Sequence, residues 1–134
     1  MIKLVLNKIK IDENRNEQII VLKEETGSRY LPVVIGVAEV NAIKLKLSGI
    51  NPPRPLTHDL LLRSIESLGA KLKEIHIDKL EQNTFFAKLV MTRNGSGEVK
   101  VDARPSDSIA LALRAGVPIF VVEEVLEQAG ISEI

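Results

Sequence analysis

The sequence has 134 residues and a mass of 14.8 kDa, which fits one domain that buries roughly two-thirds of its unfolded surface. Eighteen basic side chains balance eighteen acidic ones, so the formal net charge of zero argues against a tight, sequence-independent nucleic-acid binder. No apolar stretch approaches the ~20 residues of a membrane helix. The first residues alternate as in a strand instead of forming a signal peptide, and cysteine is absent. We therefore expect a cytoplasmic protein with no membrane partner and no disulfides.

The N-terminal third has the alternation that is typical of β-strands. Apolar residues share one face up to Leu6 and the opposite face from Ile9, so the phase slips near Asn7 and Lys8. Such a slip predicts a β-bulge or a sharp bend. Strands are expected over residues 1–12, 18–24 and 29–35, with turns over 12–16 and 26–28. Because Pro32 has no N–H to donate, its strand is expected at an edge or paired on one side there.

Two helices are expected next. The apolar spacing becomes helical at Val37, Gly49 is a natural stop, and Glu39 in the first turn is expected to contact solvent and the helix dipole. A proline-rich segment leads to Thr57, which is expected to cap a helix over 57–68. The buried stripe of that second helix is expected to consist of Leu60, Leu61, Ile65 and Leu68.

The second half of the chain predicts an antiparallel meander followed by a helix, a short strand and a last helix. These elements are expected over residues 70–80, 84–93, 97–103, 106–115, 118–122 and 123–128. With three-residue loops, the register places His76, Lys88 and Asp102 in one cross-strand row, where a solvated charge ladder is the simplest interpretation. The whole pattern predicts a single α+β domain over 1–134, with a largely antiparallel or mixed sheet and helices packed on one side.

Charged residues cluster where the last strand of the meander leads into the helix expected over residues 106–115. Pro105 suits the first helical turn, Ser106 can cap it, and Asp107 suits its positive end. The unpaired N–H groups there, with Arg104 beside them, can hold an anion such as a phosphate. A well-capped core helix, ending with Arg114 near a glycine, is the competing interpretation.

The residues that could carry chemistry are few, and no nucleotide-loop, dinucleotide or zinc-protease motif is present, so no organic cofactor is expected. The catalytic candidates are His58, Asp59, Asp102 and Asp107. The candidate phosphate ligands are Arg54, Arg104, Ser106 and Lys88. His58 at a helix start could act as a neutral base, although exposed histidines are commoner there. Asp102 and Asp107 are candidate ligands for Mg²⁺ or Mn²⁺.

Two long motifs in this order resemble the bifunctional nuclease domain family. They are RPLTHD at 54–59 and DARPSDSIALALR at 102–114, supported by LPVVIG at 31–36 with Glu39 and TFFA at 84–87. The resemblance extends over about residues 1–126. It implies a small prokaryotic-type domain whose relatives cleave DNA and RNA.

Three classes of function stay open at this point. A nuclease would stabilise charge on a phosphodiester, with a divalent metal and an Arg or Lys, and would contact nucleic acid locally and weakly. A non-catalytic phosphate or nucleotide sensor would use the same two helix starts. A structural oligomerisation module would use the edge strand at Pro32 and the apolar terminal segments, and on this ground we also expect a homo-oligomer.

Overall fold

The computed structural model describes residues 1–12, 14, 17–94 and 96–133, and within these it contains seven strands and four helices. In chain order they are β1 (Ile2–Asp12), β2 (Glu17–Glu24), β3 (Tyr30–Ile35), α1 (Val37–Leu47), α2 (Thr57–Ser67), β4 (Ala70–Glu81), β5 (Thr84–Arg93), β6 (Glu98–Ala103), α3 (Pro105–Ala115), β7 (Ile119–Val121) and α4 (Glu123–Ala129). The predicted turn over 12–16 and the turn at 94–96 fall partly outside the described residues. Among the described helices, none has the length and apolar character needed to cross a bilayer.

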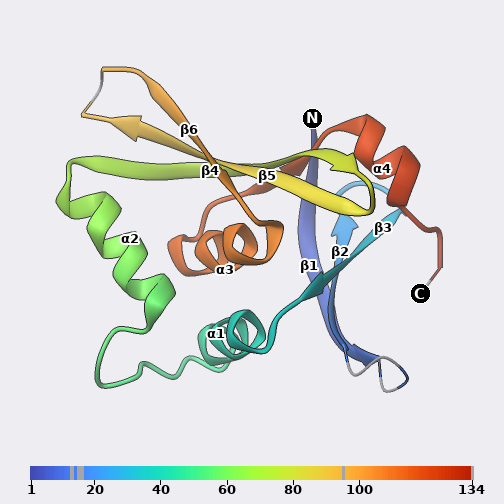
Figure 1. The fold of residues 1–134 in the computed structure, drawn as a ribbon, viewed down its shortest axis with the longest axis horizontal. Coiled ribbons are helices and arrows are strands. Elements are labelled where there is room, and N and C mark those ends of the chain that lie inside the picture. The colour runs from blue at the N-terminus through green and yellow to red at the C-terminus, as the bar shows by residue number, and fades with distance from the viewer. Residues whose placement is uncertain (13, 15–16, 95, 134) are drawn as a thin grey trace.

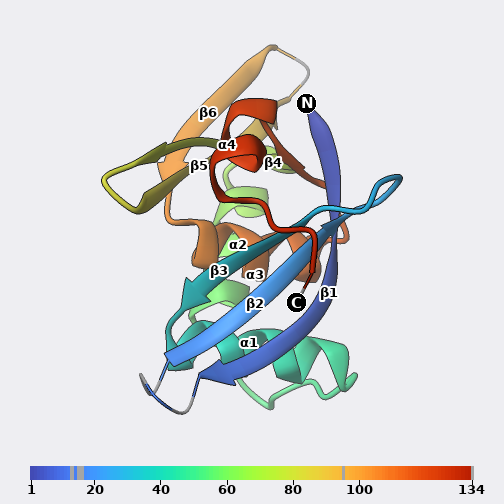
Figure 2. The same ribbon diagram turned by 90° about the vertical axis from the view of Figure 1, so that its right-hand side faces the viewer.

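The strands form one sheet in the order β3-β2-β1-β7-β4-β5-β6, in which β4 and β7 run parallel and all other neighbours run antiparallel. Helices α1, α2 and α3 lie on the same side of this twisted sheet, below β4–β6 in Figure 1 and behind β1–β3 in Figure 2. Helix α4 packs against β4 and β3. The predicted single α+β domain with a largely antiparallel, mixed sheet is confirmed.

The N-terminal hairpin confirms the predicted irregularity of β1. Its pairing with β2 shifts register between Leu6 and Lys8, which is where the hydrophobic phase slips. Strand β3 is an edge strand, as Pro32 predicts. At its start Tyr30 exchanges two backbone hydrogen bonds of 2.8 Å with Ile131, so the segment after α4 covers part of this edge.

The meander has the predicted register. His76 lies opposite Lys88, and Lys88 lies opposite Asp102. Lys88 Nζ is 3.5 Å from an oxygen of Asp102 and 3.5 Å from an oxygen of Asp78, while His76 pairs with Glu74. Two bulges in β4 were not predicted, although the apolar phase slips at both of them, from Leu72 to Ile75 and from Ile77 to Leu80.

The predicted buried stripe of α2 is wrong in three of its four residues. Leu60, Leu61 and Leu68 are 58%, 41% and 85% exposed, and only Ile65 packs partly against the core. Helix α2 instead turns His58 and Leu62 toward α3 and β4. Consecutive leucines make the helical phase ambiguous in sequence, so the neighbouring helix decides which face is buried.

Two predicted helix caps are also wrong. Helix α2 begins with Thr57 as its first residue, and the carboxylate of Asp59 accepts a 3.1 Å hydrogen bond from the N–H of Leu56. Helix α3 begins with Pro105, so Ser106 lies inside the first turn and is buried. In both helices the residue before the first turn is extended and its side chain makes no cap.

Candidate active site

The first turns of α1, α2 and α3 are joined by side chains that meet at Arg104, the residue before α3. Its Nη2 donates to Glu39 Oε1 of α1 at 2.6 Å, and its Nε donates to Asp107 Oδ2 of α3 at 2.9 Å. Despite these two partners, the Arg104 side chain is 68% exposed. The guanidinium is therefore held in one orientation and still faces solvent.

His58 extends this cluster to α2. Its Nε2 lies 3.0 Å from Asp107 Oδ1, so both carboxylate oxygens of Asp107 are engaged. The His58 side chain is only 10% exposed. The predicted exposed histidine at a helix start is thus a packed histidine bonded to an acid. We call Glu39, His58, Arg104 and Asp107 the helix-start cluster.

The burial of Glu39 corrects the expectation that it contacts solvent. It is buried because the start of α1 packs against α3, where Arg104 provides a charged partner. The glycine before α1 contributes to this placement: a Cβ added to Gly36 would lie 2.5 Å from Glu39 Oε2. The absence of a side chain at Gly36 therefore leaves room for the carboxylate.

The charges of the cluster stabilise one another. Burial alone would raise the pKa of Asp107, but the hydrogen bonds from His58 and Arg104 outweigh it and hold that pKa below its usual value. The hydrogen bond to Asp107 raises the pKa of Arg104, with Glu39 adding to the effect. At neutral pH the cluster therefore contains an ionised Asp107 and a charged Arg104.

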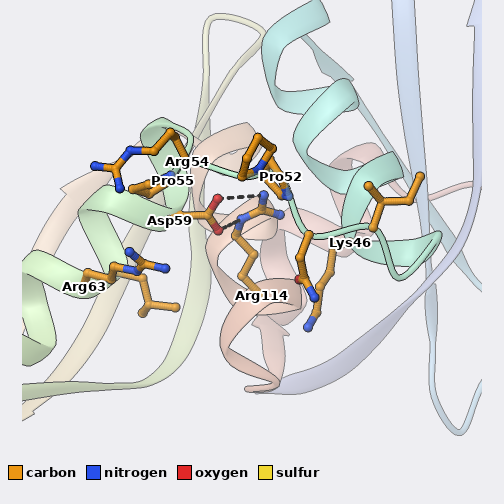
Figure 3. A pocket seen from close by; sticks show the side chains of 11 residues that line it. Lys46, Pro52, Arg54, Pro55, Asp59, Arg63 and Arg114 are labelled. Carbon is orange, nitrogen blue, oxygen red and sulfur yellow. Dashed lines mark hydrogen bonds and ion pairs between the residues drawn. The ribbon is translucent and has the colours of Figure 1, made fainter.

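A second ion pair uses the next residue of α2. Arg114 Nε and Nη2 donate to the two oxygens of Asp59 at 2.6 and 3.3 Å (Figure 3). Nη1 of Arg114 donates to the carbonyl of Ala42 at 2.8 Å. Arg114 thus links all three helices, a role that its position near a helix end did not reveal. The hydrogen bond from Arg114 lowers the pKa of Asp59, against the effect of burial.

These lowered pKa values predict how stability depends on pH. Because Asp59 and Asp107 titrate lower in the folded than in the unfolded chain, their contribution is present above about pH 4 and is lost as pH falls through the folded values. Urea unfolding measured at pH 6, 4, 3 and 2 should show the loss. The loss of unfolding free energy between pH 6 and pH 2 should be smaller in Asp59→Asn than in the wild-type protein. It should equal the wild-type loss in Glu66→Gln, which changes an exposed residue of α2 as a control.

Two cavities flank this region, and three of the four predicted phosphate ligands are divided between them. The first has a volume of about 480 Å³ and is lined by residues 32–36, 83–85 and 104–106. It unites three segments that lie far apart in the chain, and it includes Arg104 and Ser106. The second has a volume of about 460 Å³ and includes Arg54. Arg54 of the RPLTHD motif and Arg104 of the DARPSDSIALALR motif therefore do not share a cavity.

The two candidate metal ligands, Asp102 and Asp107, and the candidate phosphate ligand Lys88 already have charged partners. Asp102 and Lys88 pair with each other on β6 and β5, whereas Asp107 uses both of its oxygens within the cluster. Among the described residues, no three His, Cys, Asp or Glu side chains are grouped to hold a metal ion. The donors as placed do not form a ready metal site, so we derive no step through a metal.

Comparison with known proteins agrees with this arrangement of motifs. The family model of the bifunctional nuclease domain matches residues 20–133 of this chain. The matched region includes the two motif segments at the starts of α2 and α3. The chain belongs to this family, and the resemblance stated from its motifs is confirmed.

The relatives include proteins from bacteria and plants. The chain is 50% identical over 123 residues to an uncharacterized protein of Mycobacterium tuberculosis, a match that covers 92% of this chain and 73% of the relative. It is 28% identical over 127 residues to bifunctional nuclease 2 of Oryza sativa subsp. japonica, covering 92% of this chain. It is 29% identical over 106 residues to bifunctional nuclease 1 of Arabidopsis thaliana, a match that covers 76% of this chain. The matches span only 39% and 32% of these two plant proteins.

Proposed function

We propose that this protein is a nuclease that hydrolyses phosphodiester bonds of DNA or RNA with little sequence preference, and that the helix-start cluster is its active site. The observation that carries the proposal is the His58–Asp107–Arg104 chain, in which a histidine bonded to an acid lies next to an exposed guanidinium. Membership of the bifunctional nuclease domain family supports the same activity.

Arg104 is the residue we expect to contact the phosphate. Glu39 and Asp107 engage its Nη2 and Nε, which leaves Nη1 to donate to a phosphate oxygen. A guanidinium that is fixed before substrate binds stabilises the charge that develops on the phosphate without reorganising. The positive end of the α3 dipole, which lies at the residue after Arg104, adds to this stabilisation.

His58 is the residue we expect to move the proton, and Asp107 orients it. With Nε2 donating to Asp107, Nδ1 carries the lone pair of a general base. Water attacks phosphorus as Nδ1 accepts its proton, the bond from phosphorus to the leaving sugar oxygen breaks, and solvent protonates that oxygen. Because His58 is largely buried, it acts on a water molecule and not by direct contact with the strand.

Metal assistance stays a prediction from the sequence, with Asp102 and Asp107 as the candidate ligands for Mg²⁺ or Mn²⁺. The cleavage assay tests it directly when it is run with EDTA, with Mg²⁺ and with Mn²⁺. Chelation should abolish cleavage if the prediction is right, and Asp102→Asn should then raise the metal concentration that is required.

Arg104→Ala should lower kcat/KM for labelled single-stranded DNA and RNA by about 100-fold, because the scissile phosphate loses its charged donor. The salt dependence of binding should also become shallower by about one phosphate contact. Lys10→Ala, which removes an exposed cation on β1, should leave both quantities unchanged. Absence of cleavage by wild-type protein under all three metal conditions would overturn the proposal.

A further inference from the structure

The second cavity contains more positive charge than its neighbours neutralise. It lies between the end of α1, residues 50–55, α2 and Arg114, and its volume is about 460 Å³. Its charged lining consists of four cationic side chains, Lys46, Arg54, Arg63 and Arg114, and one acidic one, Asp59, an excess of three positive charges. We call it the basic cleft.

The excess charge is not used inside the protein. Asp59 is already bonded to Arg114, which is only 8% exposed. Within the described parts of the chain, the side chains of Lys46, Arg54 and Arg63 form neither a hydrogen bond nor an ion pair, and Arg63 acts on Asp59 only at longer range, where its charge helps to lower the pKa of that carboxyl. Figure 3 shows Lys46 on the α1 side of the cleft and Arg63 on the α2 side, with Arg54 near the start of α2. Three unpaired cations around one hollow repel each other, and a bound anion would relieve that repulsion.

The cleft is also rigid before any ligand arrives. Pro52, Pro53 and Pro55 restrict the backbone of the segment that forms its rim. Asp59 bonds the backbone N–H of Leu56, and Arg114 ties Asp59 to the carbonyl of Ala42. The flanking helices are therefore fastened to each other beneath the cleft, so binding orders the cationic side chains and needs little ordering of the backbone.

The residue types define the ligand. Two arginine forks and one lysine are donors suited to phosphate oxygens, and three positive charges match more than one phosphate group. Among the described residues that line the cleft, none is aromatic and able to stack on a base. Its volume suits a small ligand. The lining, as far as the structure describes it, contains no histidine, and its one carboxylate is bonded to Arg114. The basic cleft therefore has the groups for binding an anion and not for cleaving it.

We propose that the basic cleft binds a group of two or more adjacent phosphates and recognises them without reading a base. These phosphates belong to a free pyrophosphate or nucleoside polyphosphate, or to successive positions of a nucleic-acid strand. The inference is separate from the nuclease proposal, because it places no residue of the helix-start cluster in the cleft.

Calorimetric titration of the full chain with sodium pyrophosphate, at low and at physiological salt, tests the proposal. Pyrophosphate should bind more tightly than inorganic phosphate. Arg54→Ala and Arg63→Ala should each weaken its binding by about tenfold, since each removes one charged donor. Arg54→Lys should recover only part of the loss, because the fork is missing. Circular dichroism checks that each variant is folded.

Three controls separate the alternatives. Lys10→Ala should leave pyrophosphate binding unchanged, which distinguishes the cleft from general surface charge. In an Arg104→Ala background, Arg54→Ala and Arg63→Ala should still weaken pyrophosphate binding by the same factor, which distinguishes the cleft from the active site. Nucleoside triphosphates with different bases should bind equally. Competition by a short oligonucleotide without terminal phosphate would assign the site to a strand, and failure to compete would assign it to free polyphosphate. Pyrophosphate binding that is absent, or unaffected by both arginine substitutions, would overturn the proposal.

Discussion

Asp107→Asn is expected to lower the rate of phosphodiester cleavage by about two to four orders of magnitude while the protein remains folded. The substitution keeps the shape of the side chain, but it removes the charge that orients His58 and Arg104. Single-turnover cleavage of a labelled oligonucleotide measures the effect, and urea unfolding checks the fold.

Further variants separate orientation from direct contact. His58→Gln should be as damaging as Asp107→Asn, and the double variant should lose little more, because the two side chains act as a unit. Gly36→Ala should reduce the cleavage rate less than Asp107→Asn does. The added Cβ displaces the Glu39 carboxylate from its position beside Arg104, but the carboxylate is still present. Full activity in Asp107→Asn would remove the His58–Asp107 pair from the mechanism.

Arg114→Ala is expected to lower the free energy of unfolding by about 3–5 kcal/mol, the usual cost of removing one partner of a buried ion pair. Arg114 is 8% exposed, and its loss removes the charged donor of Asp59, which keeps the N–H of Leu56 as a donor, and the Arg114 donor of the Ala42 carbonyl. Urea denaturation measures the change as a lower midpoint at an unchanged slope.

Arg63→Ala is the matched control, because it removes an exposed arginine from the other side of the same cleft and should change the unfolding free energy by less than about 0.5 kcal/mol. A double-mutant cycle with Asp59→Ala isolates the energy of the pair. A cost below about 1 kcal/mol for Arg114→Ala would mean that water replaces the arginine in solvating Asp59.

Where local signals were strong, the sequence predicted the structure well. The alternation of apolar and polar residues predicted the strands, and its phase slip predicted the irregularity in β1. The short loops predicted the register that places Lys88 opposite Asp102. Pro32 placed its strand at an edge, and Gly116, with φ of 69°, ended α3 as a left-handed cap. Each of these features depends on residues close together in the chain.

The candidate site was less predictable, because its contacts join segments far apart in the sequence. Asp107, Arg104 and His58 were all named as candidates, but nothing local indicated that they would bond to one another. Glu39 resembled an ordinary solvent-facing acid at a helix start. Arg114 resembled a helix-end cation.

The sequence by itself determined the α+β class, the family and most of the residues with chemical potential, since composition, periodicity and motif order are properties of the chain alone. Only the tertiary structure decided how these residues are grouped. Packing of α1 and α2 against α3 buries Glu39 beside Arg104 and bonds Arg114 to Asp59. It also places Arg54 and Arg104 in different cavities. Helix orientation sets these distances, and it depends on side chains that pack across the whole core.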